Sequence, residues 1–367
     1  MSSSNPPVGG RSRRLAPGCG LLALVALVAA ADPACAAAAS PYALGSGYPL
    51  PWLGLTAGGY VTLRGGNLEG EPVKAVVKDL SLFLSTDLSA RWHFFTELEL
   101  GDALTWTSDG LSVSDAEFDV ERLYLDRNLA PRATLRLGKF LTPVGRWNLI
   151  HADPLVWSVF RPLTTSAAFA RHASGVALLG SWPFAESTLD YQVYADDSSA
   201  IDPGAGYEPT FLDAPVTPNP NNVFDHGAGL RLHYQAFDNS LQLGFSAARF
   251  TLTHQPGTKS LVGADLFYVS SGMELTGEAV YREDAGGDGP EWGGFAQLVL
   301  PAGHGFYAVL SAERFKAEGY SQATDIGHLG IAYRPIPPLS VKIELQESQG
   351  AEELAPDGWQ VSMSVLF

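Results

Sequence analysis

The feature that most constrains this chain is a repeated run of about ten residues in which apolar and polar side chains alternate. In the segment "VKIELQ", residues 341–346, every first residue is apolar and every second one is polar. Successive side chains of a β-strand point to opposite faces, so such runs predict strands with one apolar and one polar face. No window after residue 40 holds the 18 consecutive apolar residues expected of a membrane-spanning helix. The sequence therefore predicts an all-β protein.

The alternating segments number about sixteen, within a range of roughly 14 to 18, because strand boundaries are the least reliable part of a sequence pattern. The segments are 53–64, 78–88, 91–101, 118–128, 132–140, 173–182, 186–196, 225–236, 240–252, 261–270, 273–283, 291–300, 305–316, 323–334, 339–348 and 358–367. They follow one another without a linker, which predicts a single domain over residues 40–367.

The connections between these segments alternate in length. Every second one is tight, such as "SA" after 78–88, whereas the others include 65–77, 102–117, 141–172 and 197–224. A soluble β-sandwich shows the same alternation within strands, but it has no reason to place short and long connections in turn. The pattern predicts a transmembrane, antiparallel, up-and-down β-barrel with short periplasmic turns and long extracellular loops.

The N-terminal residues 1–39 have the features of a cleaved export signal. Three arginines between residues 11 and 14 precede an apolar run of about 12 residues, which is too short to span a bilayer, and alanines lead up to the expected cleavage site near Ala39. Both cysteines, Cys19 and Cys35, lie in this segment, so the exported part is expected to have no disulfide and no cysteine-based metal site. Removing residues 1–39 takes away three arginines and Asp32, which changes the formal net charge from −16 to −18. Such a chain is not expected to bind nucleic acid.

The C-terminal segment "GWQVSMSVLF" alternates strictly and ends in Phe367. It resembles the C-terminal signature of bacterial outer-membrane barrels. The resemblance implies that the chain resides in the outer membrane, with the lipid bilayer around it.

The third long connection, 141–172, is the longest, and it follows a strand that ends in "GKF". The stretch "RLGKFLTPVGRWN", residues 136–148, resembles a motif of the bacterial outer-membrane porin superfamily, which includes the phosphate-selective porins. The resemblance is strongest over residues 132–175. It implies a passive channel, a third loop that folds inward, and assembly as a homotrimer. A barrel of about sixteen strands leaves an aqueous lumen, so an inward loop would narrow it.

The candidate site residues fall into two groups. Charged residues of the third loop are candidates for a pore constriction, although salt bridges that merely hold the loop to the wall would require the same residue types: Arg146, His151, Asp153, Arg161, Arg171 and His172. Charged residues on the polar faces of the strands are candidates for the pore wall: Glu97, Glu99, Arg136, Arg231, Glu274, Glu278, Glu313, Lys342 and Glu344. Trp147, Trp157 and Phe160 are expected to anchor the loop.

The acidic wall sets the expected selectivity. Phosphate-selective porins depend on basic pore residues, so phosphate selectivity does not follow from the resemblance. Rings of acidic side chains favour cations, which predicts a mild cation preference for a channel that passes ions or small hydrophilic solutes.

Two other functions remain as alternatives. A barrel sheath or scaffold for a periplasmic partner is one, but it needs a wide lumen without an inward loop. An outer-membrane hydrolase is the other, and it lacks a set of residues with assignable catalytic roles, since Ser174 near His172 has no Gly-x-Ser-x-Gly turn around it. We therefore expect no enzyme activity, no cofactor and no metal.

Overall fold

The computed structural model describes residues 47–150, 152–202, 223–253, 255–287, 289–351 and 354–367. The predicted export signal, residues 1–39, lies outside the described residues. Each of the sixteen predicted segments corresponds to one strand, which confirms the predicted all-β barrel. These strands are β2 (Leu55–Leu68), β3 (Lys74–Ser89), β4 (Trp92–Thr107), β6 (Glu117–Ala130), β7 (Ala133–Leu141), β8 (His172–Pro183), β9 (Ser187–Asp196), β10 (Phe224–Ala236), β11 (Leu241–Leu252), β12 (Gln255–Ser270), β13 (Met273–Asp284), β14 (Glu291–Gly303), β15 (Phe306–Lys316), β16 (Thr324–Ile336), β17 (Leu339–Gln349) and β18 (Gly358–Leu366).

Five short elements were not predicted. Two are the three-residue strands β1 (Tyr48–Leu50), which pairs with β2, and β5 (Gly110–Ser112), which pairs with the end of β4. The others are single helical turns, α2 (Trp147–Ile150), α3 (Leu163–Ser166) and α4 (Ser198–Ile201). No helix within the described ranges is long and apolar enough to span a membrane.

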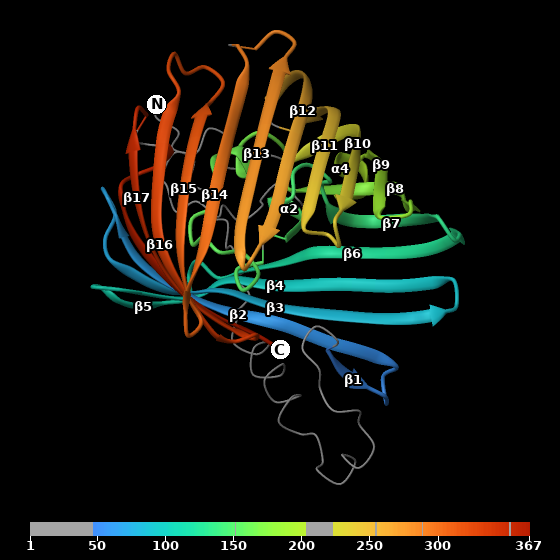
Figure 1. Cartoon of the computed structure of the whole chain (residues 1–367), viewed down its shortest axis with the longest axis horizontal. Helices are drawn as coiled ribbons and strands as arrows, with labels where there is room; N and C mark the ends of the chain where they lie inside the picture. Colours follow the sequence, from blue (N-terminus) through green and yellow to red (C-terminus); the bar gives the residue numbers. More distant parts are fainter. Residues whose placement is uncertain (1–46, 151, 203–222, 254, 288, 352–353) are drawn as a thin grey trace, which may run out of the picture. The chain divides into compact units, whose positions relative to one another are not determined.

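The sixteen long strands form one antiparallel sheet that closes on itself (Figure 1). Each strand pairs with its neighbour in sequence, and β18 pairs with β2 from Gly358 opposite Leu68 to Leu366 opposite Tyr60. Closure leaves none of the sixteen long strands at a sheet edge, which is the requirement for a sheet that lies in hydrocarbon.

The two faces of the sheet differ as the alternation predicted. On β17, Lys342 and Glu344 on the inner face are each 2% exposed, whereas Ile343 and Leu345 on the outer face are 46% and 49% exposed. The apolar side chains therefore point away from the barrel, and the charged ones point into it.

The connections alternate in length around the barrel as well. Those that follow β3, β6, β8, β10, β12, β14 and β16 contain two to four residues. In the turns Ser271–Gly272 and His304–Gly305, both residues have positive φ, the geometry that suits the twist of a two-residue hairpin. The opposite connections are longer, apart from residues 253–254 between β11 and β12.

The C-terminal phenylalanine takes part in closing the barrel. The backbones of Phe367 and Gly59 exchange two hydrogen bonds, of 2.8 and 2.9 Å. A Cβ atom on Gly59 would lie 3.0 Å from the Phe367 ring and 2.1 Å from the carbonyl oxygen of Ser81. The absence of a side chain at position 59 therefore lets β3 and the Phe367 ring approach β2.

We predict that Gly59→Ala destabilises the barrel by about 1–3 kcal/mol, the usual cost of overpacking, because the added methyl group overlaps backbone that cannot rotate away. The measurement is the temperature of prior incubation at which the folded form is lost. The folded form is recognised by its mobility on a denaturing gel, which differs from that of the unfolded form. Gly327→Ala on β16 is the matched control, since the nearest atom to its Cβ is 4.0 Å away. Equal transition temperatures for the two variants would contradict the role of this contact.

Candidate functional site

The connection from β7 to β8, here called L3, comprises residues 142–171, of which 151 lies outside the described residues. Thr142 and Arg171, the first and last residues of L3, form what is here called its neck. A backbone hydrogen bond closes this neck, because the N–H of Thr142 donates to the carbonyl of Arg171 over 2.8 Å. Between these ends L3 contains α2 and α3. Figure 1 shows α2 within the space that the strands surround.

Three glutamates of the barrel wall bind the backbone of L3. They lie on alternate strands, β13, β15 and β17, and the carboxylate of each accepts hydrogen bonds from two successive backbone N–H groups. Glu278 binds the N–H groups of Arg146 (2.9 Å) and Trp147 (2.5 Å), Glu344 binds those of Val159 (2.6 Å) and Phe160 (2.9 Å), and Glu313 binds those of Leu163 (3.1 Å) and Thr164 (2.6 Å).

This pairing has a local physical cause. Trp147 and Leu163 are the first residues of α2 and α3, and the first N–H groups of a helical turn have no partner within it. The oxygens of one glutamate side chain satisfy two such N–H groups at once. Glu313 gains a third bond, of 2.6 Å, from the Thr164 hydroxyl.

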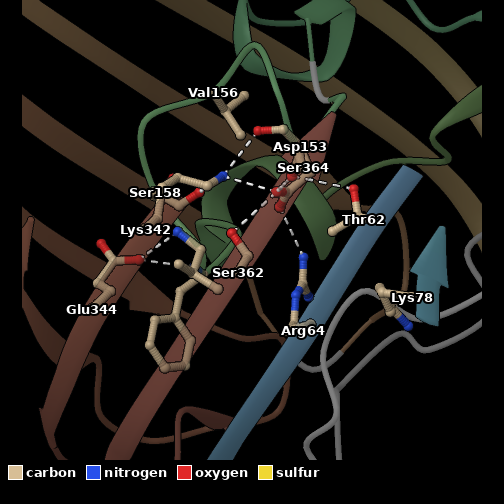
Figure 2. A network of polar contacts seen from close by, with 12 residues as sticks. Thr62, Arg64, Lys78, Asp153, Val156, Ser158, Lys342, Glu344, Ser362 and Ser364 are labelled. Atoms are coloured by element: carbon tan, nitrogen blue, oxygen red, sulfur yellow. Dashed lines mark hydrogen bonds and ion pairs between the residues drawn. The ribbon is translucent and has the colours of Figure 1, made fainter. Parts of the chain in front are cut away.

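Asp153 binds L3 to the seam where the first and last strands of the barrel meet (Figure 2). Its carboxylate forms ion pairs with Arg64 on β2 (3.2 Å) and with Lys342 on β17 (3.1 Å). It also accepts hydrogen bonds from the hydroxyl groups of Ser362, at 3.2 Å, and Ser364 on β18. One loop carboxylate therefore connects three strands.

The surroundings of Asp153 favour its charged form. Burial opposes ionisation, but the charges of Lys342 and Arg64 and the hydrogen bonds from Ser364 and Lys342 outweigh it and lower the pKa of Asp153 to about 2. The Lys342 ammonium also donates to the backbone carbonyls of Asp153 and Ser158, each over 2.9 Å.

The three aromatic residues that were expected to anchor L3 pack against the wall. Trp147 is buried with Val156 against Phe295 of β14. The Phe160 ring lies 5.4 Å from the imidazole of His328 on β16.

Trp157 makes the most varied contacts of the three. Its Nε1–H donates to Glu274 over 2.7 Å, and its ring lies 4.6 Å from that of Tyr307. The Arg334 guanidinium stacks 3.6 Å from the centre of the same ring and donates to the carbonyl of Val156 over 2.8 Å. Polar and apolar contacts therefore hold the same side chain.

Of the predicted constriction residues, Asp153 and Arg161 lie together. They line one cavity between L3 and the wall formed by β2 and β3, where Arg64 and Asp79 contribute further charges. The other lining residues are Tyr60, Trp147, Val156 and Val159. Two guanidinium groups and two carboxylates thus border the same space.

The remaining constriction candidates lie elsewhere. The Arg146 guanidinium is half-buried, 4.0 Å over the ring of Phe267, and donates to Gln242 over 2.6 Å. Arg171 forms an ion pair with Glu121 of β6 at the end of L3, and Nε2 of His172 lies 3.3 Å from the same carboxylate. His151 lies outside the described residues.

The predicted wall residues are buried or half-buried, and most have a polar partner on the wall or on L3. Glu274, Glu278, Glu313, Lys342 and Glu344 contact L3 as described above. The other four are bound to residues of other wall strands: Glu97 to Arg122 (2.5 Å), Glu99 to Ser81 (3.0 Å) and Tyr60 (3.5 Å), Arg136 to Asp126 (2.8 Å), and Arg231 to Asp265 (2.6 Å).

Four residues of this region were not singled out from the sequence. Asp79 and Glu121 lie on the polar faces of predicted strands, so the alternation pattern carried a signal for them. Tyr60 lies in a segment that was predicted as a strand. Asn148 lies in a loop without any period, where no sequence pattern distinguishes it.

We predict that Glu313→Gln releases the α3 end of L3. The amide group of glutamine presents one acceptor oxygen instead of two and replaces hydrogen bonds to a charged group, each worth about 1.5–3 kcal/mol. Hydrogen exchange at the backbone amides of Leu163 and Thr164 is expected to accelerate. Glu347→Gln, at an exposed position on the outer face of β17, is the control and should leave both amides protected.

We predict that the contacts of Asp153, which hold L3 to β2, β17 and β18, persist until the pH approaches 2. The pKa of Asp153 lies below the usual value of about 3.9, so its ion pairs stabilise the protein fully above that value and are lost as the pH falls through about 2. Tryptophan fluorescence reports the change, because Trp147 and Trp157 lie in L3. Asp153→Asn should abolish this acid transition, and an unchanged transition in that variant would refute the assignment.

The comparisons with known proteins concern mainly the fold. No family model matches the chain. A part of 111 residues, 30% of the chain, is 32% identical to an uncharacterized protein of Aquifex aeolicus, of which the match covers 24%.

The solved structures that resemble the chain over most of its length include outer-membrane porins and channels. The anion-selective porin of Comamonas acidovorans has a TM-score of 0.56 and 13% identity, over 85% of this chain and 99% of that one. OmpF of Salmonella typhi has a TM-score of 0.56 and 11% identity, over 85% and 97%. The outer-membrane channel DcaP of Acinetobacter baumannii has a TM-score of 0.56 and 12% identity, over 88% and 100%. The closed sixteen-strand barrel of this chain is thus the fold of the bacterial outer-membrane porins.

Proposed function

We propose that the chain is an outer-membrane porin, a water-filled channel for the passive diffusion of ions or small hydrophilic solutes. Its barrel has the porin fold, an apolar outer face that suits lipid, and a charged inner face that suits water. Residues 1–39 act as the export signal in this proposal.

The observation that carries the proposal is the attachment of L3 to the inner wall. Carboxylates from β13, β15 and β17 bind its backbone, and Asp153 binds it to β2, β17 and β18. A loop held across the lumen of a wide barrel narrows the path of a solute. This arrangement supports a selective channel over a sheath for a periplasmic partner, which needs an open lumen.

The constriction in this proposal lies between L3 and the wall formed by β2 and β3. Arg64 and Arg161 border that space together with Asp79 and Asp153. The four side chains are between 4% and 8% exposed, so the gap between them is narrow, and in this proposal their opposed charges orient the polar solutes that approach it.

We also propose a mild preference for cations. It rests on the acidic balance of the chain, which carries 39 acidic against 23 basic residues. Glu278, Glu313 and Glu344 contribute less to it than their number suggests, because their carboxylates are engaged by backbone N–H groups of L3.

The test is conductance in planar lipid bilayers. The purified protein should form open channels in symmetric KCl, and a KCl gradient should give a reversal potential of the sign expected for cation preference. Deletion of residues 146–165 should raise the single-channel conductance and weaken selectivity, since it removes the segment that narrows the lumen. Folded protein without conductance would refute the channel, and an unchanged conductance after the deletion would refute the role of L3.

A homotrimer is part of the proposal through the sequence resemblance alone. Chemical cross-linking of the protein in outer-membrane fractions would test it.

A further inference from the structure

Asn148 lies near the start of L3 and is not among the residues that line the cavity that we assign to the constriction. It is in α2, and its side chain is fully buried, with 0% exposure. Its amide nitrogen donates to the backbone carbonyls of Thr142 (2.9 Å) and Arg171 (3.1 Å), which are the first and last residues of L3. The side chain therefore reinforces the neck that the Thr142–Arg171 backbone bond closes.

The same side chain holds Arg161. The amide oxygen of Asn148 accepts a hydrogen bond of 2.9 Å from Nη2 of Arg161, and this nitrogen also donates to the carbonyl of Thr165 over 2.9 Å. The guanidinium lies 4.9 Å from the centre of the Trp147 ring. Arg161 is 5% exposed and lines the cavity that also contains Arg64, Asp79 and Asp153.

These contacts require an amide of this length. An asparagine side chain offers two N–H donors and one acceptor oxygen, which matches two carbonyls and one guanidinium. A carboxylate has no donor for the two carbonyls, and alanine has neither group. A glutamine side chain is longer by one methylene group, so at this fully buried site its neighbours would have to move to admit it.

We propose that Asn148 is a positioning residue for the selectivity of the channel: it fixes the guanidinium of Arg161 at the constriction and couples that position to the neck of L3. The inference rests on the proposed function, since it concerns the ion preference of that channel. A guanidinium held by two acceptors presents its charge at one place, whereas a released one moves with the side chain and loses its influence on passing ions.

The experiment is a double-mutant cycle read out as the reversal potential in a KCl gradient, with wild type, Asn148→Ala, Arg161→Ala and the double variant. Both single variants should shift the potential in the direction of stronger cation preference, because each removes or displaces a positive charge. In the Arg161→Ala background, the further change Asn148→Ala should produce no additional shift. Ser166→Ala is the control within L3, since among the described residues the Ser166 hydroxyl donates to the backbone carbonyls of Pro162 and Leu163, and it should keep the wild-type potential.

The outcomes separate this inference from the proposed function. If wild-type protein does not conduct, the channel itself is refuted. If it conducts and Asn148→Ala keeps the wild-type potential, or if the two shifts add, only the role of Asn148 is refuted. Asn148→Ser, which retains one hydroxyl in the site, enters the same cycle if the alanine variant does not reach the folded form.

Discussion

The structure depends on the pairing of β18 with β2. A sheet with free edges would leave rows of backbone N–H and C=O groups unpaired, and in hydrocarbon each such group costs several kcal/mol. Closure removes that cost and at the same time creates an interior. The strands pack closely at this seam, because Gly59 has no side chain and leaves room for the Phe367 ring and for the backbone of β3. One of the contacts that hold L3 lies at this seam, where Arg64, Ser362 and Ser364 bind the carboxylate of Asp153.

The interior contains many buried charges, and their pairing explains the position of L3. A carboxyl group that is withdrawn from water needs hydrogen-bond partners. Glu278, Glu313 and Glu344 find them in backbone N–H groups of L3, several of which begin a helical turn and would otherwise lack acceptors. Wall and loop therefore satisfy each other. In the sequence, these acidic side chains suggested a preference for cations. In the structure, they accept hydrogen bonds from the backbone of L3.

The sequence predicted the barrel well because strand alternation is a local property. In segment 339–348 the alternation of polar and apolar residues predicts which side chains face the interior and which face outward. The structure places Lys342 and Glu344 on the inner face, as predicted. The site was predicted less completely, because it depends on contacts between residues far apart in the chain. Asp153 and Arg161 share one cavity, whereas Arg146 stacks on Phe267 and Arg171 pairs with Glu121. Nothing in the order of residues 142–171 separates these cases.

The sequence by itself determined the fold class, the number of long strands and the face on which most strand side chains lie, since all three follow from a period of two residues. Bulges break this period, as on β3, where the adjacent residues Lys78 and Asp79 are both buried. Only the tertiary structure decided which carboxylate binds which N–H group of L3. The bond from Glu313 to Thr164 spans 149 residues, and that from Asp153 to Ser364 spans 211. Such partners are brought together by closure of the barrel. No local sequence pattern specifies which residue of the inner face lies opposite which residue of the loop.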